Sequence, residues 1–388
     1  MGFDNILQAA RTLTKDSNLA GLEAWKKENP RRLAIGCFPA YVPCEIIHAA
    51  GMLPVGLFPE QLRANSSEND PSLQAFPCSV CKNTLSLASQ GRLDVLDGVV
   101  LSTPCEPVLE LESVLTRDFP HLLIRRLQLP DKRGSGTAVD HWETELRRLA
   151  LDFEKELGTP VADYSLGASI VVYNLWRQRV RELYDQRVRL PHKISAAELY
   201  SLVRMGTRLP PEEHILILQD ALREVPRRPN RTRPRLGIVL EGAVCEPPPP
   251  GLLETLERSG CYILDDDLLI GWRWFFEDVP MTDNPWRSLA ESYLERGVVS
   301  SVGQPIPRFG VAALLNKVRR SRADAVFFLP GKPCGTEILD VDTYRAALDE
   351  AGIPNLEIRV DETMDLDETT RVVRTFINST LSHPLTPT

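Results

Sequence analysis

The chain has 388 residues, of which 43% are hydrophobic and 25% charged, and this length suits two domains better than one ordinary core. Its formal net charge of −8 argues against a nucleic-acid partner, which requires a clustered basic face. The sequence shows neither an apolar run of the roughly 18–20 residues that span a membrane nor a signal-peptide pattern at its start. We therefore expect a cytoplasmic protein, in which eight cysteines indicate metal or redox chemistry rather than structural disulfides.

Strand-like and helix-like segments alternate in the first third of the chain, after an opening segment to about residue 28 that reads as helix. Apolar runs bounded by turn residues predict four strands, at 33–38, 54–58, 97–102 and 121–127. Between them, helices are predicted at 44–50, at about 79–90 and near 106–117. This order is typical of βαβ units around a parallel sheet.

A different pattern follows. Residues from about 139 to 224 read as long helices without clear strands, and the proline-rich run 226–234 reads as a linker. A second βα series has strands at 235–241, 261–264, 325–329 and 356–360, and helices near 249–259, 286–296, 308–321, 336–351 and 367–380. We predict an α/β fold with two doubly wound, flavodoxin- or Rossmann-like parallel-sheet domains, joined by a helical segment. The expected domain ranges are 1–138, 139–230 and 231–388, with the site in the cleft between the strand ends.

Four cysteines fall where such folds gather their chemistry. Cys78 and Cys81 form a CxxC in the run FPCSVCK, Cys105 follows VVLSTP, and Cys334 follows VFFLPGKP. In an open α/β sheet, ligands bind outside the carboxyl ends of the strands. Thiolates that converge there from distant parts of the chain predict a metal centre, and their softness favours iron–sulfur or zinc.

Other interpretations of the same spacing stay open. The CxxC resembles a thioredoxin-type redox turn, but a disulfide oxidoreductase would leave Cys105 and Cys334 unexplained. Structural zinc sites usually show two close ligand pairs, whereas this sequence has one. From spacing alone, an iron–sulfur centre, a zinc or redox site, and buried thiols are all compatible with the sequence.

Three segments carry a resemblance to a known family. The run IGCFPAYVPCEIIHAAGMLPVGL at 35–57 resembles the N-terminal signature of the 2-hydroxyacyl-CoA dehydratase and benzoyl-CoA reductase family. DVLDGVVL at 94–101, which leads to Cys105, is similar to that family's second cysteine segment. LEGAVCEPPPPGLLETLERSGCYILDDD at 240–267 is similar to the family's smaller cluster-bearing subunits, of the benzoyl-CoA reductase kind. The resemblance runs in order from about residue 31 to 380.

This resemblance implies an iron–sulfur cluster held by three cysteines from separate segments of the chain, which here are Cys78, Cys105 and Cys334. The cofactor it implies is a [4Fe–4S] cluster; some relatives carry a double-cubane [8Fe–9S] cluster with more cysteine ligands. The surplus thiols near predicted strand ends are therefore further candidate ligands, and we expect at least one of them to bind: Cys37, Cys44, Cys81 and Cys245. Cys261 begins a predicted strand, so we expect it in the core.

The chain departs from the family pattern at three positions. Cys44 stands where the family usually has an acidic residue, and Glu106 and Gly335 stand where an Asp usually follows the ligand cysteine. The first change adds a possible ligand. The other two lengthen or remove a carboxylate near the cluster, which changes its hydrogen bonding and potential. The exact reaction therefore stays open.

Glu45 and His48 are the candidate proton-transfer residues, because they lie one turn apart at the start of a predicted helix whose N-terminus faces the cleft. The alternatives are a carboxylate that complements the helix dipole and a core histidine. The three aspartates 265–267 lack the alternating spacing of a calcium loop, and we expect a solvated strand end there.

The function implied by the resemblance is that of the iron–sulfur subunit of an ATP-dependent aromatic acyl-CoA reductase, performing low-potential single-electron ring reduction. The sequence PGKP at 330–333 lacks the leading glycine and the Ser/Thr of a Walker A motif. ATP hydrolysis then falls to separate iron–sulfur activator subunits, beside a larger homologous cluster-bearing subunit. The alternatives are an (R)-2-hydroxyacyl-CoA dehydratase component, a homodimeric double-cubane reductase, and a non-enzymatic zinc module.

The helical segment offers a surface for such a partner. Its apolar positions either contact a partner subunit or pack on the first sheet, and the sequence leaves both open: Ile170, Val171, Leu175, Val180 and Leu183.

Overall fold

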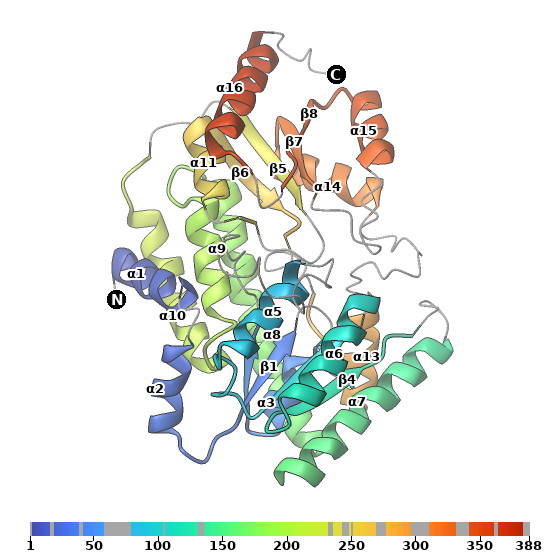
Figure 1. Cartoon of the computed structure of the whole chain (residues 1–388). Coiled ribbons are helices and arrows are strands. Elements are labelled where there is room, and N and C mark those ends of the chain that lie inside the picture. The colour runs from blue at the N-terminus through green and yellow to red at the C-terminus, as the bar shows by residue number, and fades with distance from the viewer. Residues whose placement is uncertain are drawn as a thin grey trace.

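The structure is a computed structural model (Figure 1). It describes residues 2–15, 19–38, 42–57, 79–103, 105–130, 136–231, 236–242, 248–249, 251–268, 277–295, 310–330, 341–360 and 364–382. The opening segment forms two helices, α1 (Phe3–Lys15) and α2 (Ala20–Glu28), where the sequence predicts one.

The first sheet consists of four parallel strands in the order β2-β1-β3-β4. Its strands are β1 (Ala34–Phe38), β2 (Leu53–Gly56), β3 (Gly98–Ser102) and β4 (Leu123–Leu127). The helices that follow the first three strands are α3 (Cys44–Ala49), α5 (Ser79–Ser89) and α6 (Glu106–Asp118). Every described element agrees with the predicted βαβ order, and boundaries shift by a few residues.

The two faces of this sheet belong to two different hydrophobic clusters. Ile35 and Cys37 of β1 pack with α3 and the long helices on one face. Phe38 of β1 and Leu101 of β3 pack with α5 and α6 on the other. Right-handed crossovers explain this division, because the chain moves from β1 to β2 in one direction and from β2 to β3 in the opposite direction.

The predicted helical segment forms four helices, α7 (Gly136–Leu157), α8 (Asp163–Arg189), α9 (Ala196–Met205) and α10 (Pro211–Glu224), followed by the short 3-10 turn η2 (Val225–Arg227). Trp142, Phe153 and Leu183 are fully buried in the cluster that covers the first face of the sheet. The segment is therefore an outer layer of the first sheet rather than a separate core.

The second sheet repeats the topology of the first, with four parallel strands in the order β6-β5-β7-β8. Its strands are β5 (Leu236–Gly242), β6 (Cys261–Asp266), β7 (Ala325–Leu329) and β8 (Asn355–Glu357). Its helices are α11 (Leu252–Ser259), α14 (Val311–Ser321), α15 (Val341–Glu350) and α16 (Leu366–Ser382). The prediction of two doubly wound parallel-sheet units is confirmed.

One helix of the second half packs against the first sheet's helices. Helix α13 (Pro285–Glu295) follows β6 in sequence but contacts α7 and α8, beside which it lies in Figure 1. Trp286 and Leu289 join the first hydrophobic cluster, and the Trp286 indole donates to the Asp163 carboxylate at 2.7 Å. The sequence predicts this helix but not its partner, because an amphipathic face does not specify which surface it meets.

Among the described helices, none combines the length and the apolar composition that crossing a bilayer requires.

Candidate functional site

Both sheets have a topological switch point, between β1 and β3 in the first and between β5 and β7 in the second. Ligands of doubly wound folds bind in the crevice outside the carboxyl ends of the strands at such a point. Cys105 lies three residues after the end of β3 and is the N-cap residue of α6. Its half-buried thiol therefore lies at the positive end of a helix dipole, which favours a thiolate.

Cys81 lies on the same side of the first sheet as Cys105. It belongs to the first turn of α5, is fully buried, and packs in the cluster against which Cys105 also rests. Helices α5 and α6 contact each other. The structure thus places the second cysteine of the CxxC and Cys105 on one face of the first sheet.

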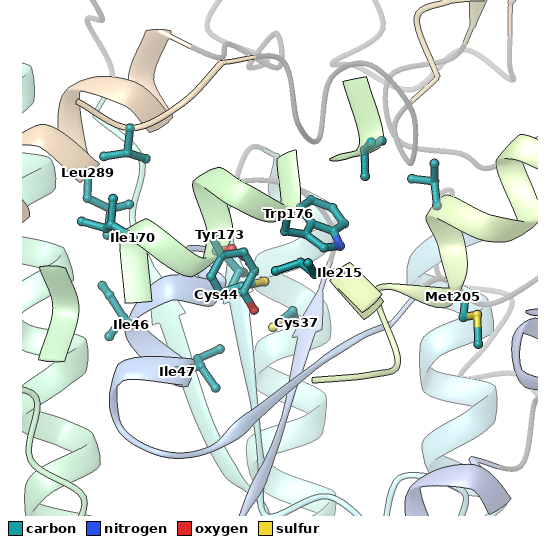
Figure 2. Packing of buried hydrophobic residues seen from close by; sticks show 14 of the residues in the cluster. Cys37, Cys44, Ile46, Ile47, Ile170, Tyr173, Trp176, Met205, Ile215 and Leu289 are labelled. Carbon is teal, nitrogen blue, oxygen red and sulfur yellow. Dashed lines mark hydrogen bonds between the residues drawn. The ribbon is translucent and has the colours of Figure 1, made fainter. Parts of the chain in front are cut away.

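Cys37 and Cys44 lie on the opposite face. Both are buried, and Figure 2 shows them beside Tyr173 and Trp176 of α8 in the first hydrophobic cluster. Burial raises the pKa of the Cys37 thiol well above its ordinary value, and the neighbouring Cys44 thiol raises it further. The Cys37 thiol is therefore protonated, as is usual for a cysteine in apolar surroundings.

Among the residues that the structure describes, no three His, Cys, Asp or Glu side chains gather closely enough to hold a metal ion. Cys78, Cys245 and Cys334 lie outside the described residues. In sequence, Cys78 directly precedes α5, Cys245 follows the last residue of β5 by three positions, and Cys334 follows the last residue of β7 by five. The ligand roles of all seven cysteines stay predictions.

Glu45 is fully buried and forms an ion pair with the equally buried Arg177 of α8. The Tyr293 hydroxyl of α13 donates to its second carboxylate oxygen at 2.8 Å. Burial alone would lower the pKa of Arg177, but the charge of Glu45, its hydrogen bond and the neighbouring Tyr293 and Asp278 together outweigh this and raise it. An arginine partner favours the ionised carboxylate, so Glu45 is placed to fasten α3 to α8 and α13.

The same ion pair extends through Asn174 to the segment that precedes α13. Arg177 donates to the Asn174 side-chain oxygen at 2.9 Å, and that oxygen also accepts from the Val279 amide at 2.8 Å. The Asn174 amide group donates back to the Val279 carbonyl at 2.8 Å. Parts of the chain more than 100 residues apart thus supply the hydrogen bonds of this network, although among the described residues the buried Nε of Arg177 has no acceptor.

His48 does not lie where the sequence places it. Helix α3 has six residues, so His48 belongs to its last turn rather than its start. Its ring contacts the Ser169 hydroxyl and the Glu212 carboxylate, both at 2.9 Å, and lines a cavity of about 320 Å³. Arg32 and Leu53, at the amino ends of β1 and β2, line the same cavity. His48 therefore faces the edge of the sheet opposite the predicted cleft.

The expectation of a solvated strand end at residues 265–267 is wrong. All three aspartates are buried, and they form a charge cluster with cations of α8 and α14. Asp266 accepts from Arg187 at 3.0 Å and Asp265 accepts from Arg320 at 2.7 Å, while Lys317 contacts Glu241 of β5 at 2.6 Å. One feature of the sequence could have indicated that these aspartates are buried. Arg187 continues the apolar face of Leu183 and Tyr184 at helical spacing, so a buried cation was to be expected there.

The helical segment's apolar positions mainly pack on the first sheet. Ile170, Val180 and Leu183 are buried in its cluster and Leu175 packs against it, whereas Val171 is 52% exposed. A partner contact through the buried three is excluded because their side chains are already covered.

The chain is thus a doubly wound α/β protein, with cysteines at the carboxyl edge of its first sheet. It belongs to the family described as 2-hydroxyglutaryl-CoA dehydratase, D-component, whose model matches residues 39–379. It is 29% identical to the C-type subunit of benzoyl-CoA reductase of Thauera aromatica, over 93% of this chain and 94% of that protein. It is 27% identical to the beta subunit of lactoyl-CoA dehydratase of Anaerotignum propionicum, over 85% and 86% of the two chains.

A third relative is the beta subunit of (R)-2-hydroxyglutaryl-CoA dehydratase of Acidaminococcus fermentans, 24% identical over 89% of this chain and 92% of the relative. All three relatives are named as subunits of larger enzymes. The chain is accordingly an enzyme subunit of the dehydratase and reductase type, and the resemblance of its segments to this family is confirmed.

Proposed function

We propose that the chain is the iron–sulfur subunit of an ATP-dependent aromatic acyl-CoA reductase of the benzoyl-CoA type. The observation that carries this proposal is the placement of Cys105 at the switch point of the first sheet, at the N-terminus of α6. Full-length similarity to the C-type subunit of benzoyl-CoA reductase supports the substrate class.

The donor set suits an iron–sulfur cluster, because thiols are the side chains that hold one. We assign Cys78, Cys105 and Cys334 as the anchors of a [4Fe–4S] cluster. Cys81 is the added candidate on the same face as Cys105, and Cys245 is the candidate from the second sheet because it follows β5 closely. Cys37 and Cys44 stay outside this set, since they face the other side of the sheet and the Cys37 thiol is protonated.

Such a cluster supplies single electrons at low potential when it is bound. The chain's own contribution is the surroundings of the thiols. The N-terminus of α6 stabilises negative charge at Cys105, and the apolar residues around Cys81 exclude water. We assign no proton transfer to Glu45, which is fully engaged in its ion pair, or to His48, which faces the opposite edge.

We further propose that the chain works in the cytoplasm with a larger homologous cluster-bearing subunit and with ATP-hydrolysing activator subunits. The relatives' names as subunits support a multi-chain enzyme. The absence of a Walker A sequence in this chain supports a separate chain for ATP hydrolysis.

The second candidate is a component of an (R)-2-hydroxyacyl-CoA dehydratase. The family description and two of the relatives named above favour it. The two functions differ in electron demand, because a reductase consumes electrons in proportion to product whereas a dehydratase needs them only catalytically. Counting the reductant consumed per product molecule separates them.

The test is anaerobic purification with iron and sulfide analysis and an electronic spectrum. We expect a brown protein, and we expect Cys105→Ser to lower its iron content markedly. Cys261→Ser is the matched control, because Cys261 is buried in the core of the second sheet and the prediction that it is a core residue is confirmed. A colourless wild-type protein, or a Cys105→Ser variant with full iron, would contradict the proposal.

A further inference from the structure

A cavity of about 460 Å³ lies between α1, α9 and α11, away from the cysteines of the first sheet. These three helices lie together on one flank of the molecule in Figure 1, and α9 contacts both of the others. Pro248, Pro249 and Gly251 line the cavity just before α11 begins, so it adjoins the carboxyl edge of the second sheet. Its volume lies within the roughly 300–1,000 Å³ of ligand sites.

Three arginines from three different helices line this cavity, Arg11 of α1, Arg204 of α9 and Arg258 of α11. Glu254 is the one acidic residue among the described lining residues. The lining therefore carries a local excess of positive charge, although the chain as a whole has a net charge of −8. Arg11 and Arg258 are exposed, and within the described part of the chain neither forms an ion pair.

Two further features of the cavity wall suit the same kind of ligand as the arginines do. The first turn of α11 lines it through Leu253 and Glu254, which places the positive end of that helix beside the arginines. Tyr200 of α9, partly exposed, contributes an aromatic ring to the wall. Guanidinium groups bind phosphate oxygens in bidentate pairs, and aromatic rings stack on nucleobases.

We propose that this cavity binds the phosphate groups of a nucleotide-type ligand. Two sources share this chemistry: the phosphorylated nucleotide half of a coenzyme A thioester, and a free adenine nucleotide. The arginines recognise the phosphates in either case, while the Tyr200 side of the cavity receives the base. The inference does not depend on the cluster, because none of the candidate cysteines lines the cavity.

The experiment measures binding to the purified full-length chain by titration calorimetry. The ligands are coenzyme A, adenosine 3′,5′-bisphosphate, ADP and inorganic phosphate. We expect affinity for the organic phosphates to fall about tenfold in Arg11→Gln and again in Arg258→Gln, since each loses a hydrogen bond to a charged group. Arg117→Gln is the control, because Arg117 is also an exposed arginine but lies on α6 of the first sheet and does not line the cavity; this variant should bind as the wild type does.

Each outcome decides the matter. Preference for coenzyme A and the bisphosphate assigns the cavity to the thioester carrier, and preference for ADP assigns it to a free nucleotide; both support the proposal if the two arginine variants weaken binding. Equal binding in the Arg11→Gln/Arg258→Gln double variant overturns it, as does inorganic phosphate that binds as tightly as the organic ligands. Because iron content is measured separately, an iron-free protein that still binds coenzyme A would refute the proposed function and leave this inference standing.

Discussion

The two sheets have the same strand order but different chemistry at their carboxyl edges. Around β1 and β3, the described residues include three cysteines, with Cys105 at the opening of α6, and one buried carboxylate, Glu45 of α3. Around β5 and β6, they are buried charges, among them Glu241, Asp265 and Asp266. Both edges therefore fasten helices by buried ion pairs, but the described cysteines that follow strands belong to the first sheet.

Helix α8 connects the two regions. Its Arg177 pairs with Glu45 of α3, the helix that follows the first sheet's β1, and its Arg187 pairs with Asp266 at the end of the second sheet's β6. The two arginines are ten residues apart, about 15 Å along the helix axis. One continuous helix thus carries a buried cation to each sheet, so substitutions at these two positions test the two regions separately.

We expect the largest effect from Arg177→Met. It leaves Glu45 fully buried without its cation, which should lower the free energy of unfolding by about 3–5 kcal/mol. Urea denaturation measures this loss. The double variant Glu45→Gln/Arg177→Met should recover most of it, because no buried charge then remains. A double variant as unstable as the single one would show that packing rather than charge sets the cost.

Arg187→Met should lower the free energy of unfolding somewhat less, by about 3 kcal/mol. Asp266 keeps the Leu268 amide at 3.2 Å and the Tyr184 hydroxyl at 3.3 Å as donors. The loss should be local to the second region, so hydrogen exchange should accelerate in β6 while protection in β1 stays as in the wild type. Equal acceleration in both strands would contradict the division of labour between the two arginines.

Sequence reasoning predicts the elements well and their long-range partners poorly. The strand at 33–38 and the helix at 79–90 agree within one residue with β1 and α5, because periodicity and turn residues are local signals. The burial of Asp266 depends on Arg187, 79 positions away, and a carboxylate at a strand end reads as exposed until its cation is known. For the candidate site, the sequence carries one local signal, the position of cysteines after strands, and the ligand set stays a prediction.

The faces of the first sheet show the same limit. Alternation along β1 predicts that Cys37 and Phe38 point in opposite directions. Which of the two directions leads to α5 and α6 depends on the crossovers of the whole sheet. The prediction from sequence therefore placed Cys37 and Cys81 in one group of candidate ligands, whereas the structure puts them on opposite faces.

The two regions should also respond to pH with opposite sign. On the first sheet's side, His214 of α10 is buried, and burial lowers its pKa to about 4. The Trp176 indole donates to its Nδ1 at 2.6 Å, which requires the neutral ring. In the unfolded chain this histidine has a pKa near 6.5. Its contribution to the free energy of unfolding is therefore fully present above about pH 6.5, and up to about 3 kcal/mol is lost as the pH drops from there through 4.

Unfolding measured between pH 7 and pH 4 checks this prediction. The wild type should lose more stability over that range than His214→Gln, which has no proton to take up. Parallel pH profiles for the two proteins would show that acidic residues alone account for the loss.

At the second sheet, Glu257 of α11 should act in the opposite direction, with the smallest effect. Burial raises its pKa to about 7, although Arg231 at 3.8 Å and the Ala196 amide at 3.0 Å partly offset this. A carboxyl group whose folded pKa exceeds its unfolded value stabilises the fold below about pH 4.5, and this contribution is lost as the pH rises through 7.

Glu257→Gln keeps an acceptor for the Ala196 amide and removes the buried charge, so it should stabilise the protein at pH 8 by about 1–2 kcal/mol and have little effect at pH 5. Urea midpoints of the variant and the wild type, compared at each of the two pH values, measure the difference. If the variant were the less stable protein at pH 8, the pair with Arg231 would outweigh the cost of burial.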